Sequence, residues 1–176
     1  MSCSCRNRRS IRLRGYDYSL AGAYFVTVCI RKQEFLFGDV VEGEMRLNDA
    51  GRIVQAMWDG LPSHYAGVRI DAFVIMPNHV HGIIILTERD VGAGLKPAPT
   101  DECRRHGLSE IVRGFKTFSS RRINELHGTP GVSVWQRNYY EHIIRNDDSM
   151  DRIRKYIVDN PARWAFDREN PAVVTK

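Results

Sequence analysis

Runs of aromatic and β-branched residues near the start of the chain predict its first strands. Tyr24 to Arg31 (Tyr-Phe-Val-Thr-Val-Cys-Ile-Arg) has the composition of a strand almost throughout. Two shorter runs, Phe35 to Val41 and Gly43 to Leu47, meet at Glu42-Gly43, which suits a tight turn. We therefore expect a strand followed by a short hairpin.

Three more strands are predicted further along the chain. Val68 to Met76 and His79 to Thr87 are separated only by Pro77-Asn78, so they are expected to pair antiparallel across a turn. The run from Gly82 to Leu86 is apolar at successive positions, as in a strand that is buried on both faces. Val132 to Arg145 is again aromatic and β-rich and predicts a strand with an irregular entry.

Apolar residues spaced three and four positions apart predict the helices. The expected helices are one capped by Asn48 or Asp49 that ends near Gly60, one from Glu110 to about Leu126 capped by Ser109, and one from Ser149 to Asn160 capped by Asp147 or Asp148. A short extra helix over 162–167 is expected to carry Trp164 into the core.

The order of these elements predicts an α+β fold. A strand, a hairpin, a helix, two strands, a helix, a strand and a helix favour an antiparallel sheet with helices packed on one face, in ferredoxin-like topology. We divide the chain into a basic N-terminal arm (1–22), a single folded domain (23–167) and a C-terminal tail (168–176). Within the domain, 88–107 is rich in Gly and Pro without periodicity and predicts an exposed insertion loop.

Composition narrows the class of protein. At 176 residues with 43% hydrophobic and 27% charged side chains, the chain is typical of one soluble domain. No stretch approaches the roughly 20 apolar residues of a membrane span, and the start carries no apolar signal-peptide segment. We expect a cytoplasmic protein without a membrane partner. The four cysteines are irregularly spaced, so they indicate neither a disulfide framework nor a zinc ribbon.

Positive charge indicates a polyanionic partner. The formal net charge is +5, and arginine is the predominant cation, the better residue for bidentate phosphate contacts. Basic residues gather in the N-terminal arm, in the middle of the chain and near its C-terminal end, which favours nucleic acid over a merely solvated surface. The candidate phosphate or DNA contacts are Arg8, Arg9, Arg12, Arg113, Lys116, Arg121, Arg152 and Lys155.

A pair of histidines lies in one predicted strand. His79 and His81 project from the same face, about 7 Å apart along the backbone, while Val80 points to the other face. Two imidazoles so placed can bind one metal ion, but a pair is only half of a coordination shell. On the pair alone, satisfied core histidines and half of a structural zinc site remain alternatives.

The last long helix presents a polar face. Arg152, Tyr156 and Asn160 are spaced four residues apart and share one side of it, while Ile153 and Ile157 share another. Each polar residue has an ordinary explanation, such as a half-buried helix tyrosine with its hydroxyl in water. Together with the histidine pair they form a set of two imidazoles, an amide and a phenol.

Several stretches resemble one family. Met-Pro-Asn-His-Val-His-Gly (76–82) resembles the histidine-hydrophobe-histidine (HUH) motif of IS200-like, single-tyrosine transposases, and Lys-Tyr-Ile-Val-Asp-Asn-Pro (155–161) is similar to their tyrosine helix. Residues 15–18, 23–27, 135–137 and 140–145 extend the resemblance to the REP-associated tyrosine transposases. It covers nearly the whole chain except the insertion and the tail.

The resemblance implies a site and a reaction. His79 and His81 would be metal ligands, and Tyr156 would be the nucleophile that forms a 5′-phosphotyrosine intermediate. Asn160 would be the third ligand, at a position where the wider family often has glutamine. The mixed nitrogen and oxygen donors favour Mg²⁺ or Mn²⁺, and Arg152 is a candidate to stabilise the phenolate or the phosphate.

The implied function is a metal-dependent endonuclease and transposase acting on single-stranded DNA. It would cleave and rejoin DNA at palindromic, REP-like hairpins. One alternative is a catalytically silent hairpin-binding regulator of the same fold, and another is a metal-dependent hydrolase that uses water. We expect a monomer, although a dimer that exchanges the tyrosine helix is also compatible with the sequence.

Overall fold

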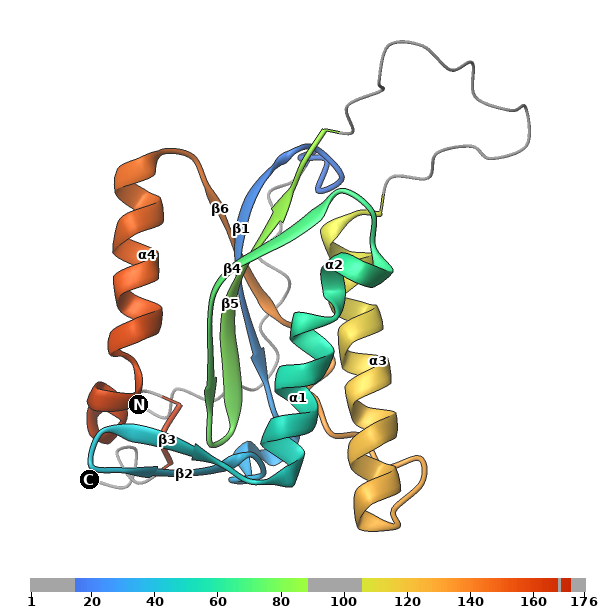
Figure 1. Cartoon of the computed structure of the whole chain (residues 1–176), viewed down its shortest axis with the longest axis vertical. Coiled ribbons are helices and arrows are strands. Elements are labelled where there is room, and N and C mark those ends of the chain that lie inside the picture. Colours follow the sequence, from blue (N-terminus) through green and yellow to red (C-terminus); the bar gives the residue numbers. More distant parts are fainter. Residues whose placement is uncertain (1–14, 89–105, 168, 172–176) are drawn as a thin grey trace.

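A four-stranded antiparallel sheet forms the centre of the computed structural model, which describes residues 15–88, 106–167 and 169–171 (Figure 1). Its strands are β1 (Gly22–Cys29), β4 (Val68–Met76), β5 (His79–Leu86) and β6 (Tyr140–Ile144). They are arranged in the order β4-β5-β1-β6. The expected Pro77-Asn78 link is confirmed as a two-residue turn, because Met76 pairs with His79 across it.

Four helices, two 3-10 turns and a hairpin complete the described fold. The helices are α1 (Asp49–Asp59), α2 (Leu61–His64), α3 (Leu108–His127) and α4 (Asp147–Asp159), and two 3-10 turns are η1 (Arg31–Gln33) and η2 (Pro161–Phe166). Strands β2 (Gly38–Val41) and β3 (Glu44–Leu47) form the predicted hairpin. Glu42 and Gly43 both have positive φ, +54° and +81°, as a two-residue type I′ turn requires.

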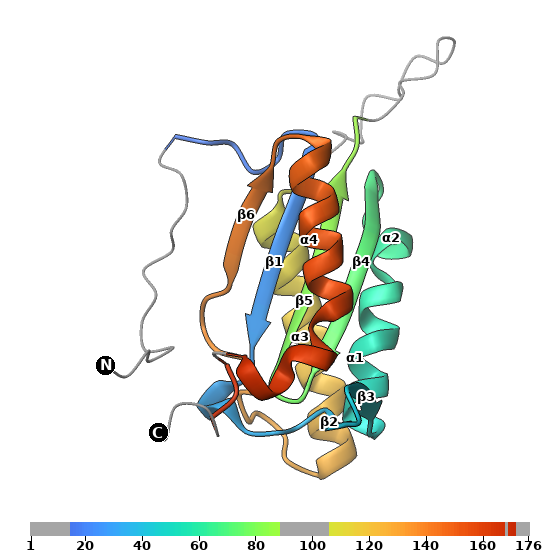
Figure 2. The same ribbon diagram turned by 90° about the vertical axis from the view of Figure 1, so that its left-hand side faces the viewer.

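The sequence of β1, α1, β4, β5, α3 and β6 is the ferredoxin-like βαββαβ unit, so the predicted α+β class and topology are confirmed. One detail of the prediction was wrong, because the helices do not all pack on one face. Figures 1 and 2 show α1 and α3 on one side of the sheet and α4 on the other.

Side-chain alternation in β5 explains why both faces are covered. Val80 and Ile84 belong to the larger core beneath α1 and α3, whereas Ile83 packs in a second cluster with Phe25 of β1 and Ile157 of α4. A strand with apolar residues on both faces exposes one of them to water unless a second layer covers it. Helix α4 supplies that layer.

Several predicted boundaries shift. Asn146 caps α4 by accepting a hydrogen bond from the Ser149 amide at 2.8 Å, and the two aspartates expected to cap it lie in the first turn instead. Gly107 precedes α3, so Ser109 is inside that helix. Only the second half of the predicted strand over 132–145 is regular, and before it Trp135 forms an isolated bridge to Ile30.

Trp164 and the two basic or Gly-rich segments were also the subject of predictions. Trp164 is half-buried rather than a core residue, because η2 lies beyond the end of the sheet, where its ring packs edge-on against Phe35. Most of the basic arm (1–14) and of the insertion (89–105) lies outside the described residues. No helix in the described part of the chain is long and apolar enough to cross a membrane.

Gly82 allows the largest core side chain to lie flat on the sheet. The Trp58 indole stacks on Phe73 with ring centroids 4.3 Å apart, and it passes directly over Gly82. A Cβ on Gly82 would lie 2.4 Å from Trp58 Cζ2 and 2.9 Å from Phe73 Cδ2, closer than non-bonded carbons approach. The glycine therefore sets the distance between α1 and the sheet.

Replacing Gly82 by alanine is expected to destabilise the fold by about 1–3 kcal/mol, the usual cost of overpacking a core. Urea unfolding followed by tryptophan fluorescence measures it. Gly107→Ala is the comparison, because a Cβ there meets nothing closer than 3.7 Å, and its effect is expected to be smaller. Equal stability of the Gly82 variant and the unsubstituted protein would contradict this account of the core.

Candidate active site

The two histidines of β5 face α4, on the side of the sheet opposite α1 and α3. Both are buried, with 0% of His79 and 4% of His81 exposed, and their Nε2 atoms are 3.0 Å apart. Val80 between them lies in the core on the other face. The predicted placement of the pair on one face is therefore confirmed, and the ring nitrogens converge on one point.

Hydrogen bonds fix the orientation of both imidazoles. Nδ1 of His79 lies 2.8 Å from Oδ1 of Asn78, whose own amide nitrogen donates to the Glu169 carbonyl at 2.7 Å. Because that Asn78 oxygen can only accept, His79 carries its proton on Nδ1 and its Nε2 has a free lone pair. Nδ1 of His81 lies 2.8 Å from the Thr27 hydroxyl, which can donate or accept.

Burial keeps both imidazoles neutral. It lowers the pKa of His81 to about 3, and burial together with the neighbouring His81 lowers the pKa of His79 well below its ordinary value. Neutral imidazole is the form that binds metal ions, since the protonated ring has no lone pair to offer. At neutral pH the pair is therefore ready to act as two nitrogen ligands.

Helix α4 places the Tyr156 hydroxyl beside this pair. Its oxygen lies 3.3 Å from Nε2 of His81, and the phenol ring packs edge-on against Phe25, with centroids 6.1 Å apart. Tyr156 is 41% exposed, so solvent and a substrate can reach it. Burial of the hydroxyl and the charge of Asp167 raise the pKa of Tyr156, so the phenol is protonated at neutral pH.

Asn160, one turn further along, offers an oxygen with no partner. The residue is 3% exposed, and its Oδ1 makes no hydrogen bond to any described residue. A buried acceptor left unpaired costs about 1–3 kcal/mol. The Asn160 side chain also bonds Tyr156 and Asp167, so its unpaired oxygen is the kind of group that a metal ion beside those residues would satisfy.

Asp167 also lies at this site, a position that was not predicted from the sequence. One carboxylate oxygen of Asp167 and one ring nitrogen of each histidine lie within 4.8 Å of one another. Burial raises the pKa of Asp167, and hydrogen bonds from the Glu169 amide and from Asn160 offset part of that effect. The residue follows η2 outside any periodic segment, so only the folded chain brings it here.

This donor set fits a divalent metal. It comprises two neutral imidazoles, an amide oxygen without a partner and a carboxylate, all on one side of the sheet. Mixed nitrogen and oxygen donors without a thiolate suit Mn²⁺ or Mg²⁺ better than a structural zinc ion. The buried surroundings also supply the hydrogen-bonded outer groups that metal-binding histidines need.

The predicted basic contacts are dispersed. Arg152 and Lys155 are exposed on α4 and Arg121 is exposed on α3, while Arg8, Arg9 and Arg12 lie outside the described residues. Arg113 and Lys116 line a cavity on the opposite side of the sheet. The nearby positive charge that lowers the pKa of Tyr156 comes from Arg163 of η2, which the spacing in α4 did not indicate.

An ion pair fastens α4 to its own sheet. The Arg154 guanidinium donates to both carboxylate oxygens of Asp71, at 2.9 and 2.8 Å. An irregularity in β4 between Ile70 and Phe73 lies where Asp71 meets the helix. The tyrosine helix thus docks beside the histidines of the same chain, and one chain supplies every group of the site.

The contribution of this pair to stability is expected to depend on pH. The hydrogen bonds from Arg154 lower the pKa of Asp71, so the pair stabilises the folded state above the ordinary carboxyl pKa of about 3.9 and loses that effect as pH falls through the lower folded value. The difference in unfolding free energy between the unsubstituted protein and Asp71→Asn should be constant near neutral pH and shrink in acid.

Urea titrations at a series of pH values measure that difference. Asp151→Asn is the control, because Asp151 bonds the same guanidinium from a side chain that is 74% exposed. If the difference in unfolding free energy for Asp71→Asn did not shrink below about pH 4, the interaction removed by the substitution would not be the Arg154–Asp71 ion pair.

Comparisons with known proteins place the chain among relatives. No family model matches it. It is 43% identical over 171 residues to an uncharacterized protein of Haemophilus influenzae, covering 92% of each chain. It is 22% identical over 150 residues to a second H. influenzae protein, named "Putative REP-associated tyrosine transposase", covering 85% of this chain and 76% of that one.

A solved structure has the same fold. It is a REP-associated tyrosine transposase bound to a REP hairpin, and it matches with a TM-score of 0.57 and 21% identity over 89% of this chain and 75% of that one. The chain belongs to one family with the uncharacterized H. influenzae protein, and the predicted relationship to REP-associated tyrosine transposases is confirmed.

Proposed function

We propose that this chain is a metal-dependent endonuclease and transposase that cleaves and rejoins single-stranded DNA at palindromic hairpins. One observation carries the proposal. The Tyr156 hydroxyl lies 3.3 Å from Nε2 of His81, one of a buried imidazole pair, and Tyr156 also bonds Asn160, which has a buried oxygen with no partner. A nucleophile and a set of metal ligands therefore meet within a single chain.

His79, His81 and Asn160 would hold a divalent ion, with Asp167 as an additional ligand. Mg²⁺ or Mn²⁺ at this position would draw charge from a phosphate oxygen of the scissile bond and orient it. Asn78 and Thr27 orient the two imidazoles through their Nδ1 atoms, so both Nε2 atoms point to the same place.

Tyr156 would attack the phosphorus in line with the leaving oxygen. Its Oη forms a bond to phosphorus as the bond from phosphorus to the 3′-oxygen breaks, which gives a 5′-phosphotyrosine and a free 3′-OH. The phenol releases a proton and the departing oxygen takes one up, so nothing is oxidised or consumed. Attack by the 3′-OH of another strand reverses the step, which is why cleavage and rejoining need no nucleotide cofactor.

The positive charge near the phenol favours its ionised form. Arg163 lowers the pKa of Tyr156, against burial and Asp167, which raise it. Arg152, exposed on the Tyr156 side of α4, is assigned to the phosphate of the incoming strand rather than to the phenol. The exposure of Tyr156 leaves room for an unstacked backbone, which single-stranded DNA provides.

Hairpin DNA is the proposed partner because of two lines of support. The net charge of +5 favours a polyanion, and the solved relative of the same fold is a protein bound to a REP hairpin. We further propose that the protein acts as a monomer, since Arg154 and Ile157 attach the tyrosine helix to the sheet of its own chain.

Labelled hairpin oligonucleotides test this function. Incubation with the full chain and Mn²⁺ is expected to give a covalent protein–DNA band in denaturing gels and a shortened strand, and EDTA is expected to abolish both. Cleavage without a covalent band would support a hydrolase that uses water. Binding without cleavage on any tested hairpin would support a silent hairpin-binding regulator.

A further inference from the structure

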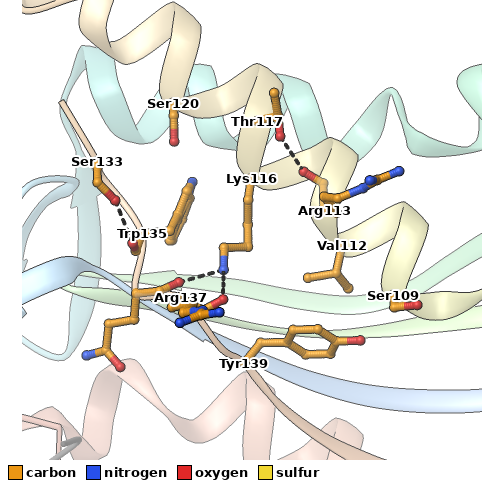
Figure 3. Close-up of a pocket in the computed structure, with 11 residues that line it drawn as sticks. Ser109, Val112, Arg113, Lys116, Thr117, Ser120, Ser133, Trp135, Arg137 and Tyr139 are labelled. Carbon is orange, nitrogen blue, oxygen red and sulfur yellow. Dashed lines mark hydrogen bonds between the residues drawn. The ribbon is translucent and has the colours of Figure 1, made fainter. Parts of the chain in front are cut away.

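A cavity of about 400 Å³ lies on the face of the sheet opposite Tyr156. It lies between α3 and the segment 133–139 that leads into β6, as Figure 3 shows, and it opens to solvent. Its volume is within the range of about 300–1,000 Å³ that ligand sites occupy. The active site proposed above uses none of the residues that line it.

Three cations line this cavity. Lys116 reaches from α3 to the facing segment, Arg137 lies on that segment, and the Arg113 side chain extends along α3 (Figure 3). No carboxylate is among the described residues that line it. Three positive charges confined with no compensating acid favour an anionic ligand over a neutral one.

Lys116 is held in place rather than extended into solvent. Its Nζ donates to the carbonyl oxygens of Gln136 and Arg137, at 2.5 and 3.0 Å. Burial lowers the pKa of Lys116 to about 8, which leaves most of the side chain charged at neutral pH. These bonds also tie α3 to the facing segment, so the cavity has a defined shape.

The remaining wall suits a base as well as a phosphate. Tyr139 contributes half-buried aromatic surface in front of the buried Val112 and Trp135, and Ser109, Thr117, Ser120 and Ser133 add hydroxyls around the edge. Aromatic surface beside arginine is the combination by which proteins hold single-stranded nucleic acid, because a base can stack while its phosphate is paired. An inorganic anion would leave the apolar wall unused.

A backbone hydrogen bond links the wall of the cavity to the end of the sheet that carries the histidines. The backbone N–H of Gln136 donates to the Cys29 carbonyl at 2.9 Å, and Cys29 pairs with His79 in the next strand. Strand β6 is at the edge of the sheet, so a DNA strand held here can pass around that edge to the α4 face. The two sites can therefore contact one continuous strand.

We propose that this cavity binds one unpaired nucleotide of the DNA strand whose phosphodiester is cleaved at Tyr156. The proposal rests on the function proposed above and adds to it a second anchor, on the far side of the sheet. Arg113 and Arg137 pair with the phosphate of this nucleotide, and its base lies against Tyr139. This anchor positions the scissile bond, because it fixes the strand that carries that bond.

Charge reversal inside the cavity tests the anchor. Arg113→Glu combined with Arg137→Glu is expected to weaken binding of a labelled hairpin with single-stranded flanks at least about tenfold, and to lower the slope of log affinity against log salt by about 1–2. Arg122→Glu is the matched control, since Arg122 lies on the same helix but pairs with Glu125 and does not line the cavity. Equal loss in both proteins would overturn the proposal.

A neutral substitution separates the cavity from general charge attraction. Thr117 lines the cavity and is exposed on α3, so Thr117→Trp fills the space while the fold tolerates it. Binding is expected to fall at least about fivefold with the salt slope unchanged, since no phosphate contact is removed. Unaltered binding would show that no nucleotide enters the cavity and would overturn the proposal.

Cross-linking locates the nucleotide independently. Oligonucleotides with 5-iododeoxyuridine at single positions are expected to cross-link to Tyr139 from one unpaired position, and Thr117→Trp should abolish this product. Cross-links elsewhere only would overturn the proposal. If the unsubstituted protein binds DNA but forms no covalent intermediate, the proposed reaction is wrong. The binding results then still show whether a nucleotide occupies the cavity. If it binds no DNA, both proposals fail.

Discussion

Replacing Tyr156 by phenylalanine is expected to abolish the covalent protein–DNA adduct, with cleavage reduced at least about 10⁴-fold, as when other enzymes lose their nucleophile. Phenylalanine lacks the oxygen that lies 3.3 Å from His81 Nε2, so no bond to phosphorus can form. The ring still packs against Phe25, which leaves the fold and the docking of α4 intact. Binding of the hairpin is expected to stay within about twofold of the unsubstituted protein, because the phosphate-binding cations remain.

Tyr140→Phe is the matched control for this substitution. Tyr140 lies on β6 and packs against the same Phe25, with ring centroids 6.2 Å apart, and it is neither the proposed nucleophile nor a proposed metal ligand. It should form the adduct at the normal rate. A Tyr156 variant that still cleaves DNA would indicate attack by water, and an adduct that survives in it would assign the nucleophile to another residue.

Removal of the metal ligand His81 is expected to have the second-largest effect. His81→Ala should weaken Mn²⁺ binding strongly and reduce adduct formation at least about a hundredfold, because several kcal/mol of transition-state stabilisation depend on the ion and each 1.4 kcal/mol is tenfold in rate. Calorimetric titration with Mn²⁺ and the gel assay measure the two losses. EDTA treatment of the unsubstituted protein should reproduce the second.

A stability measurement distinguishes loss of the ion from loss of the fold. Mn²⁺ at about a hundred times its dissociation constant should stabilise the unsubstituted protein by about 2.7 kcal/mol, and it should not stabilise His81→Ala. His142→Ala is the control, since it removes an exposed histidine of the same sheet. If His81→Ala gained the same stabilisation from Mn²⁺, the ion would be bound elsewhere.

The two oxygen ligands can be ranked by the same titration. Asn160→Ala removes an oxygen that has no partner among the described residues, together with the bond from Asn160 to Asp167, and it should weaken Mn²⁺ binding. Asp167→Asn keeps the shape of the side chain and removes its charge. A weaker affinity for Mn²⁺ in that variant would establish Asp167 as a ligand, and an unchanged affinity would exclude it.

Much of the fold follows from local sequence patterns. The Glu42-Gly43 turn, the Pro77-Asn78 link and the extent of α1 were predicted closely, because each depends on a few neighbouring residues whose backbone preferences agree. The start of α3 and of α4 was misplaced by one or two residues, since several polar side chains in succession could serve as caps. The half-buried state of Trp164 depends on where η2 packs, which no local pattern specifies.

The sequence by itself determined the chemistry that is available and the face on which each group lies. Strand alternation placed His79 and His81 together, and helical spacing placed Tyr156 and Asn160 on one side of a helix, because both periodicities are properties of the backbone. Only the tertiary structure decided that these two surfaces meet. That contact depends on the burial of apolar side chains on the second face of β5. It also depends on the Arg154–Asp71 ion pair, whose two residues are 83 positions apart in the sequence.

The same reason explains what the sequence could not indicate. Asp167 and Arg163 reach the site from the turn after α4, and the cavity arises where α3 faces an irregular segment before β6. None of these groups belongs to a periodic pattern, so their positions are set by packing between distant parts of the chain and not by their neighbours in sequence.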